Sequence, residues 1–129
     1  MGSFHSRLRV AALFSAGVII IGGVLFARHV RATAPDQVRP CTVTASRYKF
    51  DPPRIEVFQN DLVKIELSTT DIPHSWTVDA YRIDKRVSPG QPVTFEFRAD
   101  RVGTFPFYCN LLTEDGCRQM RGELVVKPR

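Results

Sequence analysis

The sequence predicts an all-β domain, a sandwich of about seven short strands, preceded by an apolar N-terminal segment. Short runs rich in Val, Ile, Phe and Tyr recur between residues 42 and 126, and turn signals such as Ser88-Pro89-Gly90 separate them. No helical periodicity longer than two turns occurs among these runs. The chain has 129 residues and nine phenylalanines, which is enough apolar surface for one core without disulfides.

The N-terminal segment 10–27 (VAALFSAGVIIIGGVLFA) contains no charged residue. As a helix it would rise about 27 Å, close to the roughly 30 Å hydrocarbon core of a bilayer. It is longer than the roughly 7–15 apolar residues of a signal peptide, so we favour an uncleaved anchor over a signal cleaved after Ala32. We therefore expect a short cytoplasmic N-terminus (1–9), one membrane pass (10–27) and a linker (28–40).

The domain itself is expected to extend from residue 41 to residue 129. Its expected strands in chain order are 42–46 with its continuation 48–50, 55–58, 62–68, 75–78, 93–97, 104–108 and 123–126. Asp51-Pro52-Pro53 ends the first of them, because proline cannot donate to a sheet ladder. In 62–68, Val63, Ile65 and Leu67 alternate with polar residues, and this period of two is typical of a half-buried strand.

The net charge of +5 does not indicate a nucleic-acid partner. Four of the eighteen basic residues flank the apolar segment, and from Asp36 onward thirteen acidic residues stand beside fourteen basic ones. The domain is therefore nearly neutral, with both signs interspersed as on an ordinary solvated surface. Enzymatic hydrolysis is also disfavoured, because only His74 could act as base for a cysteine, and no glycine-rich loop or paired carboxylates accompany it. We expect no enzymatic activity.

The candidate chemistry lies in the segment 107–120 and in one distant histidine. Cys109, Cys117 and Met120 fall within one short loop, and His74 is the only histidine outside the N-terminal region. Thiolate and thioether ligands select Cu(I), and imidazole suits copper as well as zinc. We predict that these four residues hold one metal ion between loops at one pole of the sandwich, with Cu(I) favoured and zinc also compatible.

Four motifs resemble the cupredoxin superfamily: Asp71–Val78 (DIPHSWTV), Ser88-Pro89-Gly90, Gly103–Cys109 (GTFPFYC) and Met120–Val126 (MRGELVV). They are similar to the periplasmic copper domain of cytochrome c oxidase subunit II and to free-standing bacterial cupredoxin-like proteins. The resemblance implies a cupredoxin-like Greek-key β-sandwich. It further implies electron transfer or Cu(I) delivery near a respiratory oxidase or other copper protein, on the periplasmic side of a bacterial cytoplasmic membrane. Secretion to the periplasm after signal cleavage is the alternative.

The loop departs from the pattern of that family at two positions. The family's dinuclear copper loop runs Cys-x3-Cys-x3-His-x2-Met, whereas this chain reads Cys109-x3-Thr113-x3-Cys117-x2-Met120. A threonine hydroxyl does not bridge two coppers as a thiolate does, and Cys117 stands where the imidazole belongs. The resemblance therefore implies an atypical site for one copper ion.

A second interpretation of the loop stays open. Cys109 and Cys117 are separated by seven residues, and a disulfide between them would contribute about 2–3 kcal/mol by the chain-entropy estimate. It would remove two ligands and leave a metal-free β-sandwich that serves as an assembly or interaction module, or as a thiol reductant of a partner. We expect Cys41 to be a buried strand-edge cysteine, and Trp76 and Phe107 to be core aromatics.

Overall fold

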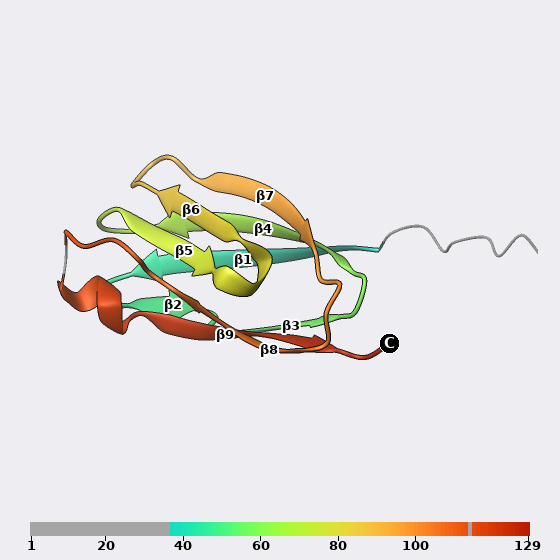
Figure 1. Cartoon of the computed structure of the whole chain (residues 1–129). Helices are drawn as coiled ribbons and strands as arrows, with labels where there is room; N and C mark the ends of the chain where they lie inside the picture. The colour runs from blue at the N-terminus through green and yellow to red at the C-terminus, as the bar shows by residue number, and fades with distance from the viewer. Residues whose placement is uncertain (1–36, 114) are drawn as a thin grey trace, which may run out of the picture. The chain divides into compact units, whose positions relative to one another are not determined.

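The computed structural model of the chain describes residues 37–113 and 115–129, which form two facing β-sheets (Figure 1). One sheet has the strand order β2-β1-β4-β7 and the other β3-β9-β8-β5-β6. Over the residues that the structure describes, the all-β prediction is confirmed, with nine strands in place of about seven. The predicted anchor 10–27 lies outside the described residues, and within 37–113 and 115–129 no helix has the length and apolarity needed to span a bilayer.

The strands are β1 (Val38–Ser46), β2 (Lys49–Asp51), β3 (Arg54–Phe58), β4 (Leu62–Thr69), β5 (His74–Val78), β6 (Ile83–Val87), β7 (Val93–Arg98), β8 (Gly103–Tyr108) and β9 (Arg121–Lys127), with two 3-10 turns, η1 (Asp79–Tyr81) and η2 (Asp115–Gln119). Strand β1 begins within the segment expected to be a linker, because its backbone pairs in parallel with β4 from Leu62 onward. Strand β6 was not predicted. It is an edge strand with a charged middle, and only Ile83 and Val87 are buried.

The core lies between the two sheets. The alternation predicted for β4 is confirmed, since Val63, Ile65 and Leu67 are fully buried. From the other sheet, Trp76 of β5 and Phe107 of β8 are also fully buried, with ring centroids 5.3 Å apart. Both were expected as core aromatics, and apolar burial on this scale is the main source of the stability of the fold.

Strand polarity places three chain segments at one pole of the sandwich. Strand β5 runs antiparallel to β8, and β8 runs antiparallel to β9. The start of β5, the end of β8 and the start of β9 therefore meet at the same end, where the connection through η2 joins the last two strands (Figure 1). We call this end the loop pole. Antiparallel pairing of the flanking strands fixes both ends of the loop in the sheet.

Candidate functional site

The chain segments that carry the four predicted ligands lie at the loop pole. Cys109 follows β8 and is bonded to Cys117 of η2, with their Cα atoms 5.3 Å apart. The backbone N–H of Cys109 donates to the carbonyl oxygen of Met120 at 3.3 Å, and the N–H of Met120 donates to the carbonyl oxygen of Cys117 at 3.1 Å. Ser75, which follows His74, donates its backbone N–H to Sγ of Cys109 at 3.4 Å. Residues from β5 and from the loop therefore meet at one sulfur atom.

The two loop cysteines form the disulfide of the second interpretation rather than a pair of free thiolates. Cys109 and Cys117 form a disulfide, and both are buried. Cys41 in β1 is free and half-buried. Burial raises the pKa of the Cys41 thiol, which the nearby Arg39 counteracts in part. Cys41 is therefore a protonated thiol at neutral pH, and a thiol in that form is a poor metal ligand.

His74 is fully buried and uses only one of its ring nitrogens. Its Nε2 lies 2.9 Å from Oδ1 of Asp71. A carboxylate only accepts hydrogen bonds, so Nε2 carries the hydrogen, and in the corresponding tautomer Nδ1 presents a lone pair. This Nδ1 is buried and has no hydrogen-bond partner among residues 37–113 and 115–129. Buried polar atoms are nearly always paired, so an unpaired one is consistent with a partner beyond the described residues.

Asp71 holds the ring of His74 in place. Burial acts against the charged form of Asp71, but the backbone N–H groups of Arg47 and Ile72 and the imidazole of His74 all donate to its carboxylate. Together these hydrogen bonds outweigh burial and lower the pKa of the Asp71 carboxyl well below its usual value. Asp71 therefore stays ionised and fixes the tautomer of His74.

We expect the substitution Asp71→Asn to lower the free energy of unfolding at neutral pH by about 1–3 kcal/mol. The pKa of Asp71 is lower in the folded than in the unfolded state. Its carboxylate therefore stabilises the fold above its unfolded pKa of about 3.9, and this stabilisation is lost as the pH falls. Urea denaturation at a series of pH values should show that the difference in free energy of unfolding between wild type and Asp71→Asn shrinks below that pH. Asp51→Asn, at an exposed position, is the matched control, and a difference that does not change with pH would contradict the assignment.

A polar network that sequence reasoning missed lies beside the sulfur of Cys109, which it contacts through Ser75. The hydroxyl of Ser75 donates to Oδ1 of Asn110 at 2.6 Å and accepts the backbone N–H of Asn110 at 2.7 Å. The side chain of Asn110 donates to Asp84 at 3.1 Å, and Thr77 donates to the same carboxylate at 3.2 Å. The only signal in the sequence is that Ser75 and Asn110 directly follow the two main candidate ligands. The network fixes β5, β6 and the loop against one another.

Whether copper fits these residues depends on the disulfide. With the disulfide closed, the remaining donors are Nδ1 of His74 and the buried thioether of Met120, and neither is a thiolate. In the described part of the chain, no group of three or more His, Cys, Asp and Glu residues is placed to hold a metal. The closed form therefore does not fit copper. Opening the disulfide would add two thiolates to the imidazole and the thioether, a soft donor set of the kind that selects Cu(I).

Known proteins resemble this chain in both sequence and structure. A family model described as a cupredoxin-like domain matches residues 17–126. Cytochrome c oxidase subunit 2 of Thermus thermophilus is 30% identical over 101 residues, which cover 78% of this chain and 74% of that protein. The same subunit of Thermostichus vulcanus is 29% identical over 111 residues, which cover 81% of this chain but only 34% of that protein.

Two solved structures share the fold. The periplasmic domain of subunit II of cytochrome oxidase from Bradyrhizobium japonicum has a TM-score of 0.63 at 15% identity, over 70% of this chain and 84% of that one. A mixed disulfide between a thioredoxin-like protein and subunit II of cytochrome c oxidase has a TM-score of 0.61 at 15% identity, over 77% of this chain and 88% of that chain. At these identities the similarity establishes the fold. With the family model covering most of the chain, the protein belongs to the cupredoxin-like domain family, and its homologues are subunit 2 proteins of cytochrome c oxidases.

Proposed function

We propose that this protein is a membrane-tethered periplasmic cupredoxin-like protein that binds one copper ion when its disulfide is open. The ligands are His74, Cys109, Cys117 and Met120, and the work of the site is Cu(I) delivery or electron transfer near a respiratory oxidase. The observation that carries the proposal is Nδ1 of His74, a buried nitrogen with no partner among the described residues. The next residue, Ser75, donates its backbone N–H to Sγ of Cys109.

The surroundings of each donor support this assignment. Asp71 holds His74 in the tautomer that leaves Nδ1 free to bind. The N–H of Ser75 would stabilise a thiolate at Cys109, since a hydrogen bond to the charged form of a group favours that form. Met120 is fully buried, so the site is shielded from water on that side. A bound copper would supply either a one-electron centre or a cuprous cargo. Two thiolates favour the cuprous state, which favours delivery.

The relatives and the N-terminal sequence support the partner and the location that we propose. The curated relatives are subunits of cytochrome c oxidase, and a respiratory oxidase is therefore the partner that we propose. The uncharged segment 10–27 is long enough to anchor the domain to a bilayer. Zinc is the competing metal, because thiolate and imidazole donors also suit it. Copper is preferred here because of the family to which the chain belongs.

The direct test is a copper titration of the full chain in two redox states. The detergent-solubilised protein is divided into a portion with the disulfide intact and a portion reduced and kept without oxygen, and each competes with a chromogenic Cu(I) chelator. We expect one copper per chain in the reduced portion and none in the oxidised portion, because only reduction frees the two sulfurs. Equal binding in both portions would show that the cysteines are not ligands.

The disulfide itself supports a second function, thiol–disulfide exchange. In this alternative the two cysteines are a reductant for a partner: the dithiol gives up two electrons and two protons as the partner's disulfide is reduced and the bond between Cys109 and Cys117 forms. One structural neighbour was solved as a mixed disulfide with a thioredoxin-like protein. Without such exchange the same closed loop would leave a metal-free interaction module. The copper titration separates these functions, since a reduced chain that binds no copper would leave only the metal-free ones.

A further inference from the structure

The end of the sandwich opposite the loop pole combines apolar and basic side chains. We call it the tether pole, because β1 starts there (Figure 1), and define it as residues 37–39, 58–62, 98–103 and 127–129. Backbone hydrogen bonds join these segments, for example from Asn60 to Ala99 at 2.8 Å and from Leu62 to Gln37 at 3.2 Å. The tether pole is thus one continuous surface.

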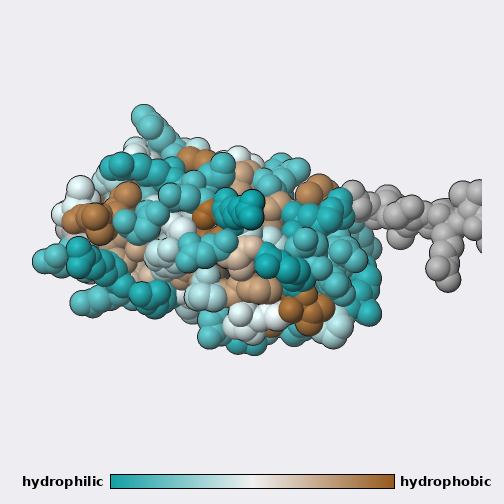
Figure 2. All heavy atoms as spheres, viewed as in Figure 1, coloured by the Kyte–Doolittle hydropathy of each residue, from teal (hydrophilic) through white to brown (hydrophobic). Residues whose placement is uncertain are grey.

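Most of the exposed large hydrophobic side chains lie on this surface. Among the described residues five large hydrophobic side chains are exposed, and three of them lie here: Val38 (49% exposed), Phe58 (39%) and Val102 (48%). Figure 2 shows apolar atoms in brown at this end, interspersed with hydrophilic ones. Single exposed apolar side chains are normal on a protein surface, but a group of them at one end favours a site of contact with a protein or a membrane.

The same surface carries a net positive charge. The four segments contain five basic and two acidic side chains, whereas residues 37–129 as a whole contain fourteen basic and twelve acidic ones. One of the two acids, Asp61, is fully buried and pairs with both Arg39 and Arg129. The guanidinium groups of these two arginines also lie over the ring of Phe58, at 5.6 and 6.0 Å from its centroid. Apolar and cationic groups are therefore presented side by side.

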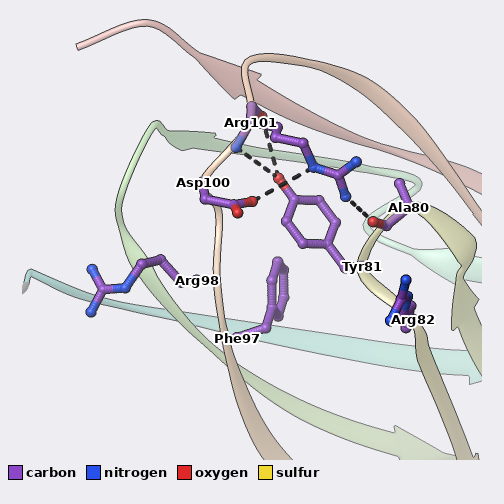
Figure 3. A pocket seen from close by; sticks show the side chains of 7 residues that line it. All are labelled: Ala80, Tyr81, Arg82, Phe97, Arg98, Asp100 and Arg101. Atoms are coloured by element: carbon purple, nitrogen blue, oxygen red, sulfur yellow. Dashed lines mark hydrogen bonds and ion pairs between the residues drawn. The ribbon is translucent and has the colours of Figure 1, made fainter.

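The β7–β8 connection adds an open depression with three guanidinium groups around it. Arg101 lies over the ring of Tyr81 at 5.0 Å, and the hydroxyl of Tyr81 donates to the carbonyl oxygen of Arg101 at 3.2 Å (Figure 3). Arg82 and Arg98 line the depression beside them, together with Phe97. Guanidinium groups recognise phosphate oxygens well, because their N–H donors form a planar fork.

We propose that the tether pole lies on an anionic lipid surface, with phosphate headgroups between the arginines and Val38, Phe58 and Val102 at the headgroup boundary. Arginines next to apolar side chains suit this interface, since their stems lie along apolar surface and their charged ends reach headgroups. The start of β1 at this pole also favours a bilayer as the partner of the surface, because the predicted anchor precedes β1 in the chain. About ten residues separate the predicted anchor 10–27 from Val38, and they reach at most roughly 36 Å when extended.

Hydrogen exchange tests this proposal on the full chain. The protein is reconstituted into vesicles of phosphatidylcholine alone and into vesicles that also contain phosphatidylglycerol, and amide exchange is followed by mass spectrometry. In the anionic vesicles we expect exchange in peptides covering 98–103 to slow at least threefold. Exchange in 110–113, at the loop pole, should not change. Added salt should remove the protection, because it screens the contact with headgroups.

A pair of matched variants tests the apolar part of the contact. Val102→Asp places a carboxylate on the tether pole, and Leu112→Asp, at a side chain 76% exposed near the loop pole, makes the same kind of change elsewhere. Neither side chain is buried, so both variants should fold, which thermal unfolding will verify. We expect Val102→Asp to lose the lipid-dependent protection and Leu112→Asp to keep it. Equal exchange of wild type in the two vesicle types, or protection that survives Val102→Asp, would overturn the proposal.

Discussion

Replacing Cys109 with serine is expected to weaken Cu(I) binding by the reduced protein at least about 100-fold, since even residues that only support metal ligands cost 10–100-fold when mutated. The sulfur of Cys109 joins the loop to β5, because it accepts the backbone N–H of Ser75 at 3.4 Å. A serine hydroxyl is a hard donor and does not replace a thiolate for Cu(I). Chelator competition on the reduced full chain measures the effect directly.

Two further variants make this result specific. Cys41→Ser removes the cysteine that is free in the structure and lies in β1, so it should leave Cu(I) affinity unchanged. His74→Ala removes Nδ1, which has no partner among the described residues, and should weaken binding strongly. If the serine variants at positions 41 and 109 bind copper equally well, Cys109 is not a ligand and thiol–disulfide exchange becomes the better description of the loop.

Truncating Trp76 to alanine is expected to lower the free energy of unfolding by about 3–5 kcal/mol. The indole is fully buried, and its ring centroid lies 5.3 Å from that of Phe107 and 5.6 Å from that of Phe95. The variant would leave a cavity between the two sheets, which the surrounding strands could close only in part. Since this is the only tryptophan, denaturation should be followed by circular dichroism.

Two matched variants separate the effect of the lost core volume from the effect of the lost indole N–H. Trp76→Phe keeps an aromatic ring in the core and removes an indole N–H that has no hydrogen-bond partner in the described part of the chain, so it should cost clearly less than the alanine variant. Leu112→Ala, at an exposed position, should stay within about 0.5 kcal/mol of wild type. A Trp76→Ala protein as stable as the Leu112→Ala protein would contradict the packing described for the core.

Local patterns predicted the parts of the fold that have one buried face. The alternation of Val63, Ile65 and Leu67 identified β4, because a half-buried strand repeats every two residues. Strand β6 escaped prediction because an edge strand can carry charge along most of its length and still pair through its backbone, as Asp84-Lys85-Arg86 does with β5. Its two buried residues, Ile83 and Val87, are too few to form a pattern.

The sequence names candidate ligands, but it does not decide the redox state of the two cysteines. The spacing of Cys109, Cys117 and Met120, together with His74, gave four candidate ligands, and the fold places their chain segments at one pole. The sequence could not decide between ligands and a disulfide, because that choice depends on the redox surroundings as well as on the chain. The role of Asp71 was also missed, since its contact with His74 depends on how the chain turns before β5.

The parallel pairing of β1 with β4 affects how the domain would respond to force. The two strands pair at eight consecutive positions, and Arg39 is also fixed to Asp61 next to the start of β4. Tension between the N-terminal side of β1 and a partner held at the opposite end would pull β1 along its own axis, so its ladder would have to shear as a unit rather than unzip bond by bond. Pulling from the N-terminal end of β1 should therefore meet high mechanical resistance.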